Sequence, residues 1–174
     1  MKTFYVPLLM AIVLIGCKAE TESDADSAAD MAFEKNSKTV LANLKGFQNE
    51  NLDYSMYADN FSLLETMFGV EKDSTSLEEM IESDKALWEV MDFKMLTDPP
   101  VLLPGVNPDT GMPDGSVRHY SEWEVTWSAT DSTAAKTGKI RLYESFDFDA
   151  EGKILVQQVY GDFSGLMTYL SGSD

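Results

Sequence analysis

The segment that most constrains the fold is residues 116–128, where apolar and polar side chains alternate along the chain. One face of this segment carries Val117, His119, Ser121, Trp123, Val125 and Trp127. Strict alternation is typical of a half-buried β-strand, and Trp and Val favour the buried side. The sequence therefore predicts a long strand whose Trp-bearing face is covered by other elements.

Two further strands are predicted over residues 139–148 and 154–163, joined by the turn Asp149-Ala150-Glu151-Gly152. A turn that begins with Asp and ends with Gly indicates a type I turn with a Gly bulge, which fixes the register of the hairpin. In that register Phe148 faces Ile154. One face is then apolar near the turn and carries Glu144, Gln158, Tyr160 and Asp162 at its far end.

The first half of the chain reads as helical. Apolar residues at helical spacing predict an amphipathic helix over residues 33–47, followed by a short helical stretch over 52–58 and a strand over 61–68. Ser76 is expected to cap a helix that runs to about residue 91. Residues 97–116 contain five Pro and three Gly, so we expect a long ordered loop there.

The N-terminal residues 1–16 resemble a signal peptide. Lys2 precedes an apolar run over residues 4–15, which is shorter than the about 20 residues that a membrane-spanning helix needs. The run ends in Leu14-Ile15-Gly16-Cys17, which resembles the bacterial lipobox, where the Cys is acylated. This resemblance implies that Cys17 attaches the protein to a membrane, with an ordinary signal peptide and a chance Cys as the alternative.

Residues 17–31 are expected to form an acidic, disordered tether, and residues 32–174 the folded domain. From Lys18 to Asp30 there are five acids and no large apolar side chain. Lys18 directly after Cys17 favours the outer membrane of a Gram-negative cell envelope. With the acids that follow, it also loosely resembles the surface-export signal of Bacteroidetes lipoproteins. A generic acidic spacer is the alternative.

Composition excludes several classes of function. With 30 acidic and 13 basic residues the formal net charge is −17, and no basic stripe is present to bind nucleic acid. One Cys and one His exclude an internal disulfide and a zinc cluster. The acids at Asp147, Asp149 and Glu151 resemble part of a calcium loop, but predicted strands flank them, so we expect a hairpin turn there. We therefore expect no metal and no cofactor.

Two segments resemble the nuclear transport factor 2-like superfamily, including its SnoaL-like branch. They are Asn51 to Phe61 (NLDYSMYADNF) and Phe146 to Asp162 (FDFDAEGKILVQQVYGD), and the order of elements agrees over about residues 33–170. The resemblance implies an α+β cone of the cystatin-like type, in which a strongly curved antiparallel sheet wraps around N-terminal helices and encloses a pocket. It also implies homodimers that pair through the sheet.

In enzymes of this superfamily, carboxylates in an apolar pocket act as acids or bases. Asp162 lies on the Tyr-x-Asp match, with Glu144 and His119 as its expected catalytic neighbours. The residues expected to line a ligand pocket are Tyr57, Trp88, Trp123, Trp127, Gln158 and Tyr160. The leading hypothesis is a domain that binds a small, largely apolar ligand. The alternatives are an isomerase, dehydratase or cyclase that uses Asp162, and a module that binds another envelope protein. The polar residues could equally form a satisfied network without chemistry.

Overall fold

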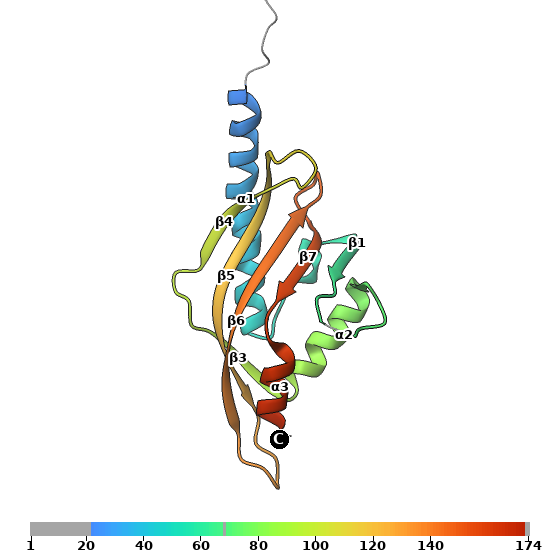
Figure 1. Ribbon diagram of the computed structural model, residues 1–174, viewed down its shortest axis with the longest axis vertical. Coiled ribbons are helices and arrows are strands. Elements are labelled where there is room, and N and C mark those ends of the chain that lie inside the picture. Colours follow the sequence, from blue (N-terminus) through green and yellow to red (C-terminus); the bar gives the residue numbers. More distant parts are fainter. Residues whose placement is uncertain (1–21, 68, 173–174) are drawn as a thin grey trace, which may run out of the picture.

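The computed structural model describes residues 22–67 and 69–172, with the side chains of 22–27 left aside, and contains one sheet flanked by helices (Figure 1). In chain order the elements are α1 (Glu22–Gln48), a 3-10 turn (Tyr54–Met56), β1 (Tyr57–Leu64), β2 (Ser74–Ser76), α2 (Leu77–Trp88), β3 (Met91–Met95), β4 (Val101–Val106), β5 (Pro113–Trp127), β6 (Lys136–Phe148), β7 (Ile154–Tyr160) and α3 (Phe163–Ser171). The expected signal peptide and Cys17 lie outside the described residues.

The sheet has the strand order β2-β1-β7-β6-β5-β3, and β4 also pairs with β5. All neighbours are antiparallel except β1 and β7, which run parallel. The sheet is curved and open, and α1 lies against β5 on its inner face (Figure 1). This arrangement confirms the expected α+β architecture.

The face of β5 that bears Trp123 is buried, as its alternation predicts. Val117 and His119 are fully buried there, and Tyr120 on the opposite face is half exposed. The core joins this face to the apolar side of α1, to α2 and to the inner faces of β1, β6 and β7. Its fully or nearly fully buried members include Val40, Leu44, Phe61, Met80, Met91, Phe146 and Ile154.

The start of α2 follows the sequence prediction. The Ser76 hydroxyl accepts a hydrogen bond from the Glu79 backbone N–H, and the Glu79 carboxylate accepts one from the Ser76 N–H at 3.0 Å. This reciprocal capping box satisfies backbone donors that the first helical turn leaves unpaired. The helix ends at Trp88, a few residues earlier than expected, and Met91 begins β3.

The N-terminal helix is longer than predicted. It begins at Glu22, so residues 22–30, which we expected in a disordered tether, are helical. The correction has a physical reason: this stretch alternates alanines with acids, alanine has the highest helix propensity, and acids near a helix N-terminus are favourable. Ala29 is also buried.

The point where α1 crosses the start of β5 is tightly packed. Gly115 has a φ of +78°, and a Cβ atom there would lie 2.5 Å from the Cβ of Ala32. The buried Asn36 side chain donates a hydrogen bond to the Gly115 carbonyl at 2.9 Å. Helix α1 and strand β5 are therefore in close contact here, and a side chain of the helix is hydrogen-bonded to the backbone of the strand.

Two local expectations in the middle of the chain are wrong. Residues 101–106 and 113–116 belong to strands β4 and β5 rather than to a loop. Proline is tolerated at Pro104 because β4 pairs only with β5 and leaves its other side free of a strand among the described residues. Helix over 52–58 is limited to Tyr54–Met56, and β1 begins at Tyr57.

The hairpin of β6 and β7 has the predicted turn but not the predicted register. Gly152 donates to the Asp149 carbonyl at 3.1 Å, and Phe148 pairs with Ile154 as expected. A bulge then shifts the pairing by one residue, so Glu144 faces Val159 instead of Gln158. Because side chains alternate between faces, this shift turns Gln158 outward.

The outward face now carries a row of tyrosines. The rings of Tyr120 and Tyr143 are 5.0 Å apart, and those of Tyr143 and Tyr160 are 6.0 Å apart. Tyr160 therefore lies on the outer surface of the sheet and not on the wall of an inner pocket.

Within the described part of the chain, no helix is both long and apolar enough to cross a membrane.

Candidate functional site

The centre of the candidate site is a buried pair on neighbouring strands. His119 on β5 and Glu144 on β6 are directly opposite each other, so their side chains share the inner face. His119 Nδ1 lies 2.9 Å from Glu144 Oε2, with His119 fully buried and Glu144 6% exposed. Among the described residues, His119 Nε2 is buried and has no hydrogen-bond partner. The sequence placed both residues on this face, and the structure brings them together.

Tyr57 lies on the same interior. Its hydroxyl oxygen accepts a hydrogen bond from Asn43 Nδ2 of α1 at 2.5 Å, and both side chains are buried. Burial raises the pKa of Tyr57, the Asn43 hydrogen bond opposes this rise, and the charges of Asp84 and Glu144 add to it. The Tyr57 hydroxyl therefore stays protonated and lies within electrostatic reach of two carboxylates.

A third polar pair involves Asp84, in the middle of α2. The Tyr54 hydroxyl donates a hydrogen bond to Asp84 Oδ2 at 3.0 Å, and Asp84 is 8% exposed. Burial raises the pKa of Asp84 to about 6, and the hydrogen bond from Tyr54 opposes the rise. The pKa of Tyr54 is raised as well, by burial and then by the Asp84 charge and the hydrogen bond to it. The interior thus holds two carboxylates: Glu144, beside the imidazole of His119, and Asp84, which accepts the hydrogen bond of the Tyr54 hydroxyl.

Aromatic rings line the interior beyond these polar groups. Phe47 of α1 packs against Phe93 at 4.9 Å, Trp88 at 5.6 Å and Trp123 at 6.1 Å between ring centroids. Trp123 donates its Nε1–H to the Ser121 hydroxyl at 2.9 Å, whereas the buried Trp88 Nε1 has no partner among the described residues. Trp127 packs against the edge of the core. These tryptophans pack in or against the hydrophobic core, and their expected role in binding a ligand stays a prediction.

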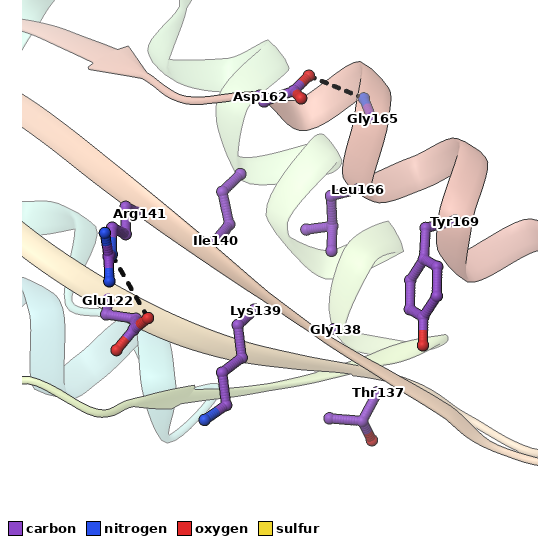
Figure 2. Close-up of a pocket in the computed structure, with 10 residues that line it drawn as sticks. All are labelled: Glu122, Thr137, Gly138, Lys139, Ile140, Arg141, Asp162, Gly165, Leu166 and Tyr169. Atoms are coloured by element: carbon purple, nitrogen blue, oxygen red, sulfur yellow. Dashed lines mark hydrogen bonds and ion pairs between the residues drawn. The ribbon is translucent and has the colours of Figure 1, made fainter.

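Asp162 does not join this interior, which corrects the prediction that it faces a pocket beside Glu144. It is exposed and caps α3, where its Oδ1 accepts a hydrogen bond from the Gly165 N–H at 2.9 Å (Figure 2). An Asp at this position satisfies a free backbone donor of the first helical turn. Gln158 and Tyr160 lie on the outer face, as the shifted register requires.

Three residues of the interior were not anticipated: Asn43, Tyr54 and Asp84. Asp84 carried a signal, because it lies four residues after Met80 and four before Trp88, on the buried face of its helix. An acid on an apolar helix face is expensive to bury, and its presence there indicates a specific partner. Asn43 likewise interrupts the apolar side of α1 next to Leu44.

Among the cavities that the described residues form, two lie on the outside of the molecule, and neither of these two is lined by His119, Glu144 or Tyr57. One, of about 760 Å³, lies between β6 and α3 (Figure 2). The other, of about 510 Å³, lies on the outer face of the sheet beside Arg118, Tyr143 and Tyr160. In the described part of the chain, no three His, Cys, Asp or Glu residues are grouped as metal ligands.

Comparison with solved structures places this geometry in a known fold. The chain superimposes with a TM-score of 0.56 on a protein described as a SnoaL-like polyketide cyclase from Shewanella denitrificans, at 11% identity over 79% of this chain and 98% of the other. It also matches an NTF2-like protein from Burkholderia xenovorans, with a TM-score of 0.57, 10% identity and coverage of 79% and 96%. The chain has the nuclear transport factor 2-like fold.

The nuclear transport factor 2-like fold is shared by proteins of different activity. The BvnE pinacolase from Penicillium brevicompactum matches with a TM-score of 0.59 at 11% identity, over 82% of this chain and 94% of the other. No family model and no curated protein matches the sequence. Since one fold carries unrelated chemistry, the function has to be argued from the interior residues of this chain.

Proposed function

We propose that this domain binds a small, largely apolar molecule inside its cone and holds the polar group of that molecule at His119 Nε2. The observation that carries the proposal is that Nε2 is buried and finds no hydrogen-bond partner within residues 22–67 and 69–172, while Nδ1 lies 2.9 Å from Glu144 Oε2. Leaving a buried polar atom unpaired costs about 1–3 kcal/mol, so a ligand group that pairs with it gains that amount on binding.

The Glu144 contact decides which ligand group fits. A carboxylate accepts the Nδ1–H of the imidazole, so in the neutral form Nε2 carries the lone pair and accepts a hydrogen bond. A ligand hydroxyl or N–H would satisfy it. The rings of Phe47, Trp88 and Trp123, which pack against one another in the interior, would contact the apolar rest of the molecule.

An acid/base enzyme is the second candidate function, and the same pair favours it. A histidine whose Nδ1 is oriented by a buried carboxylate is the arrangement that positions a general base. In an isomerase, dehydratase or cyclase of this type, His119 would remove a proton from a carbon beside a carbonyl, and Glu144 would hold the ring. Asp162 takes no part, because it lies outside the cone. The neutral Tyr57 hydroxyl could donate a hydrogen bond to a developing oxyanion.

We further propose, from the sequence alone, that the domain is a bacterial lipoprotein. Acylation of Cys17 would attach it to the envelope of a Gram-negative cell, at the outer membrane in preference to the inner one. Binding of a second copy through the sheet, or of another envelope protein, is compatible with this location. The acyl chains would supply the membrane affinity, and the folded domain would stay outside the bilayer.

Matched substitutions of His119 test the ligand proposal. His119→Asn keeps a donor near the position of Nδ1 for Glu144 and removes Nε2, whereas His119→Gln keeps a polar atom near the position of Nε2. Native mass spectrometry of the purified protein identifies any co-purified molecule, and calorimetry with naphthol as a phenolic probe measures binding. We expect His119→Asn to weaken binding at least about tenfold, which corresponds to about 1.4 kcal/mol, and His119→Gln to weaken it less. Equal affinity of all three proteins would contradict the proposal.

The enzyme candidate has its own readout. A general base at His119 would exchange the acidic α-proton of a bound ketone such as tetralone for deuterium, which NMR detects in heavy water. We expect Glu144→Gln to slow the exchange while leaving naphthol affinity within about threefold, because the amide oxygen still accepts the Nδ1–H. If the protein binds naphthol but does not exchange the tetralone α-proton, the enzyme candidate is rejected and the ligand-binding proposal is retained.

A further inference from the structure

The lower half of β6 is an open strand edge. Along residues 136–146, β6 pairs with β5, but β7 pairs with β6 only over residues 143–148. Residues 136–142 therefore have a strand on one side and, within residues 22–67 and 69–172, none on the other. At Gly161 the chain leaves the sheet to start α3: a Cβ there would lie 2.5 Å from the end of the Leu142 side chain, which would have to move to admit a larger residue.

A groove runs along this edge. The 760 Å³ cavity between β6 and α3, which we call the edge groove, is lined by Thr137–Arg141 of β6, by Glu122 of β5, and by Asp162, Gly165, Leu166 and Tyr169 of the α3 side (Figure 2). Successive side chains of a strand point to opposite faces. A cavity that five consecutive residues line therefore touches the backbone edge of the strand. Its opposite wall is α3, whose last turn contacts β6: Lys136 Nζ donates a hydrogen bond to the Tyr169 carbonyl and lies 4.1 Å from the Tyr169 ring centroid.

The two faces of the edge differ in chemistry. Thr137, Lys139 and Arg141 are exposed on the outer face, where the Arg141 side chain is 87% accessible. The inner face carries Gly138 and Ile140, beside Leu166. On the β5 side, Glu122 and Glu124 are the register partners of Arg141 and Lys139, and Arg141 lies 3.5 Å from Glu122. Each cation thus has an acid on the β5 side, and the acids Glu122 and Asp162 also line the groove itself.

We propose that the edge groove binds an extended peptide segment of a partner protein, which adds a strand to β6 and alternates acidic with apolar side chains. The backbone of such a segment would pair with the open edge, as in other cases of β-strand addition. Its acids would lie on the outer face beside Lys139 and Arg141, and its apolar side chains would lie toward Ile140 and Leu166. The edge spans about 20 Å, which accommodates about six residues in extended form.

A labelled probe peptide tests the proposal on the full mature protein. The probe is an acetylated hexapeptide of alternating aspartate and valine, and fluorescence polarisation measures its affinity. Lys139→Glu is compared with Lys94→Glu, since Lys94 of β3 is exposed and faces the same Glu124 from the other side, away from the groove. We expect Lys139→Glu to weaken binding about fivefold or more and Lys94→Glu to leave it within about twofold.

Two further measurements separate strand addition from other contacts. N-methylation of alternate peptide nitrogens removes backbone donors and should abolish binding, and amide exchange of residues 136–142 should slow when the probe binds. Absence of binding at millimolar probe, or binding that is indifferent to N-methylation and to Lys139→Glu, would overturn the proposal. Concentration-dependent dimerisation that protects the same amides without any probe would also overturn it, in favour of edge-to-edge pairing of two copies.

Discussion

Asp84 offers a sharp test of how the interior is organised. It is an acid on the buried face of α2, and burial raises its pKa to about 6 from the ordinary aspartate value of 3.8. Below about pH 4 the carboxyl group is protonated in the folded and the unfolded chain alike. As the pH rises from about 4 to 6, the unfolded chain releases this proton and the folded chain keeps it. The folded state then loses stability, and above pH 6 the loss stays constant.

The magnitude follows from the two pKa values. A difference of this size corresponds to about 3 kcal/mol of unfolding free energy at neutral pH. Asp84→Asn removes the charge and keeps an oxygen that accepts the Tyr54 hydrogen bond. We therefore expect the variant to be more stable than the wild type at pH 7 by about 2–3 kcal/mol, and nearly equal to it at pH 4.

Urea unfolding of both proteins at pH 4, 5, 6 and 7 measures the effect. Glu82→Gln is the matched control, because Glu82 is an exposed acid on the same helix and its substitution removes the same formal charge. The control should shift stability by less than about 0.5 kcal/mol at each pH. An Asp84→Asn variant that is destabilised at pH 7, or that differs from the wild type equally at pH 4 and pH 7, would refute the account of Asp84 as a buried charge.

Three other predictions concern the helix, its packing and the N-terminus. Gly115→Ala should lower the free energy of unfolding by about 2 kcal/mol or more in the same urea assay, because Gly115 has a positive φ and the new Cβ would lie 2.5 Å from Ala32. Gly111→Ala is the control, with a φ of +70° and no atom within 4 Å of the new Cβ, and it should lower the free energy of unfolding by only about 1 kcal/mol. Asn36→Ala should cost about 1–3 kcal/mol by leaving the Gly115 carbonyl unpaired, and a loss under 0.5 kcal/mol would contradict this. Cys17→Ser should abolish incorporation of a fatty-acid analogue in living cells, and labelling equal to the wild type would exclude acylation of Cys17.

Helix caps and buried strand faces were predictable where the residue types at a fixed spacing allow only one interpretation. The Ser76–Glu79 capping box follows from residue types at fixed spacing, and the buried face of β5 follows from an alternation that is clear over its whole length. The sequence analysis expected His119 and Glu144 near Asp162 and not as a pair: their direct contact follows from the register of β5 with β6, which was not predicted.

Features that depend on one extra residue or on tertiary contacts were not predictable. The bulge in β7 is hidden because Leu155 and Val156 are both apolar, so either can be taken as the inward residue. That one-residue shift moved Gln158 and Tyr160 to the outside. Asp162 was misplaced because the chain turns out of the sheet at Gly161, and β4 was missed because an edge strand tolerates the prolines that a central strand does not.

The early start of α1 changes what the acidic N-terminal stretch does mechanically. Residues 22–30 continue the helix beyond the start of β5 and extend it by about 14 Å as a stiff rod (Figure 1). If Cys17 is acylated, this rod lies between the membrane anchor and the cone, and it sets the direction in which the chain leaves the cone at Glu22. Each residue of an α-helix turns the chain by about 100°. Removing one residue between Glu22 and Ala28 would therefore shorten the rod by only about 1.5 Å but turn Glu22, where the rod begins, by more than a quarter of a revolution relative to the cone.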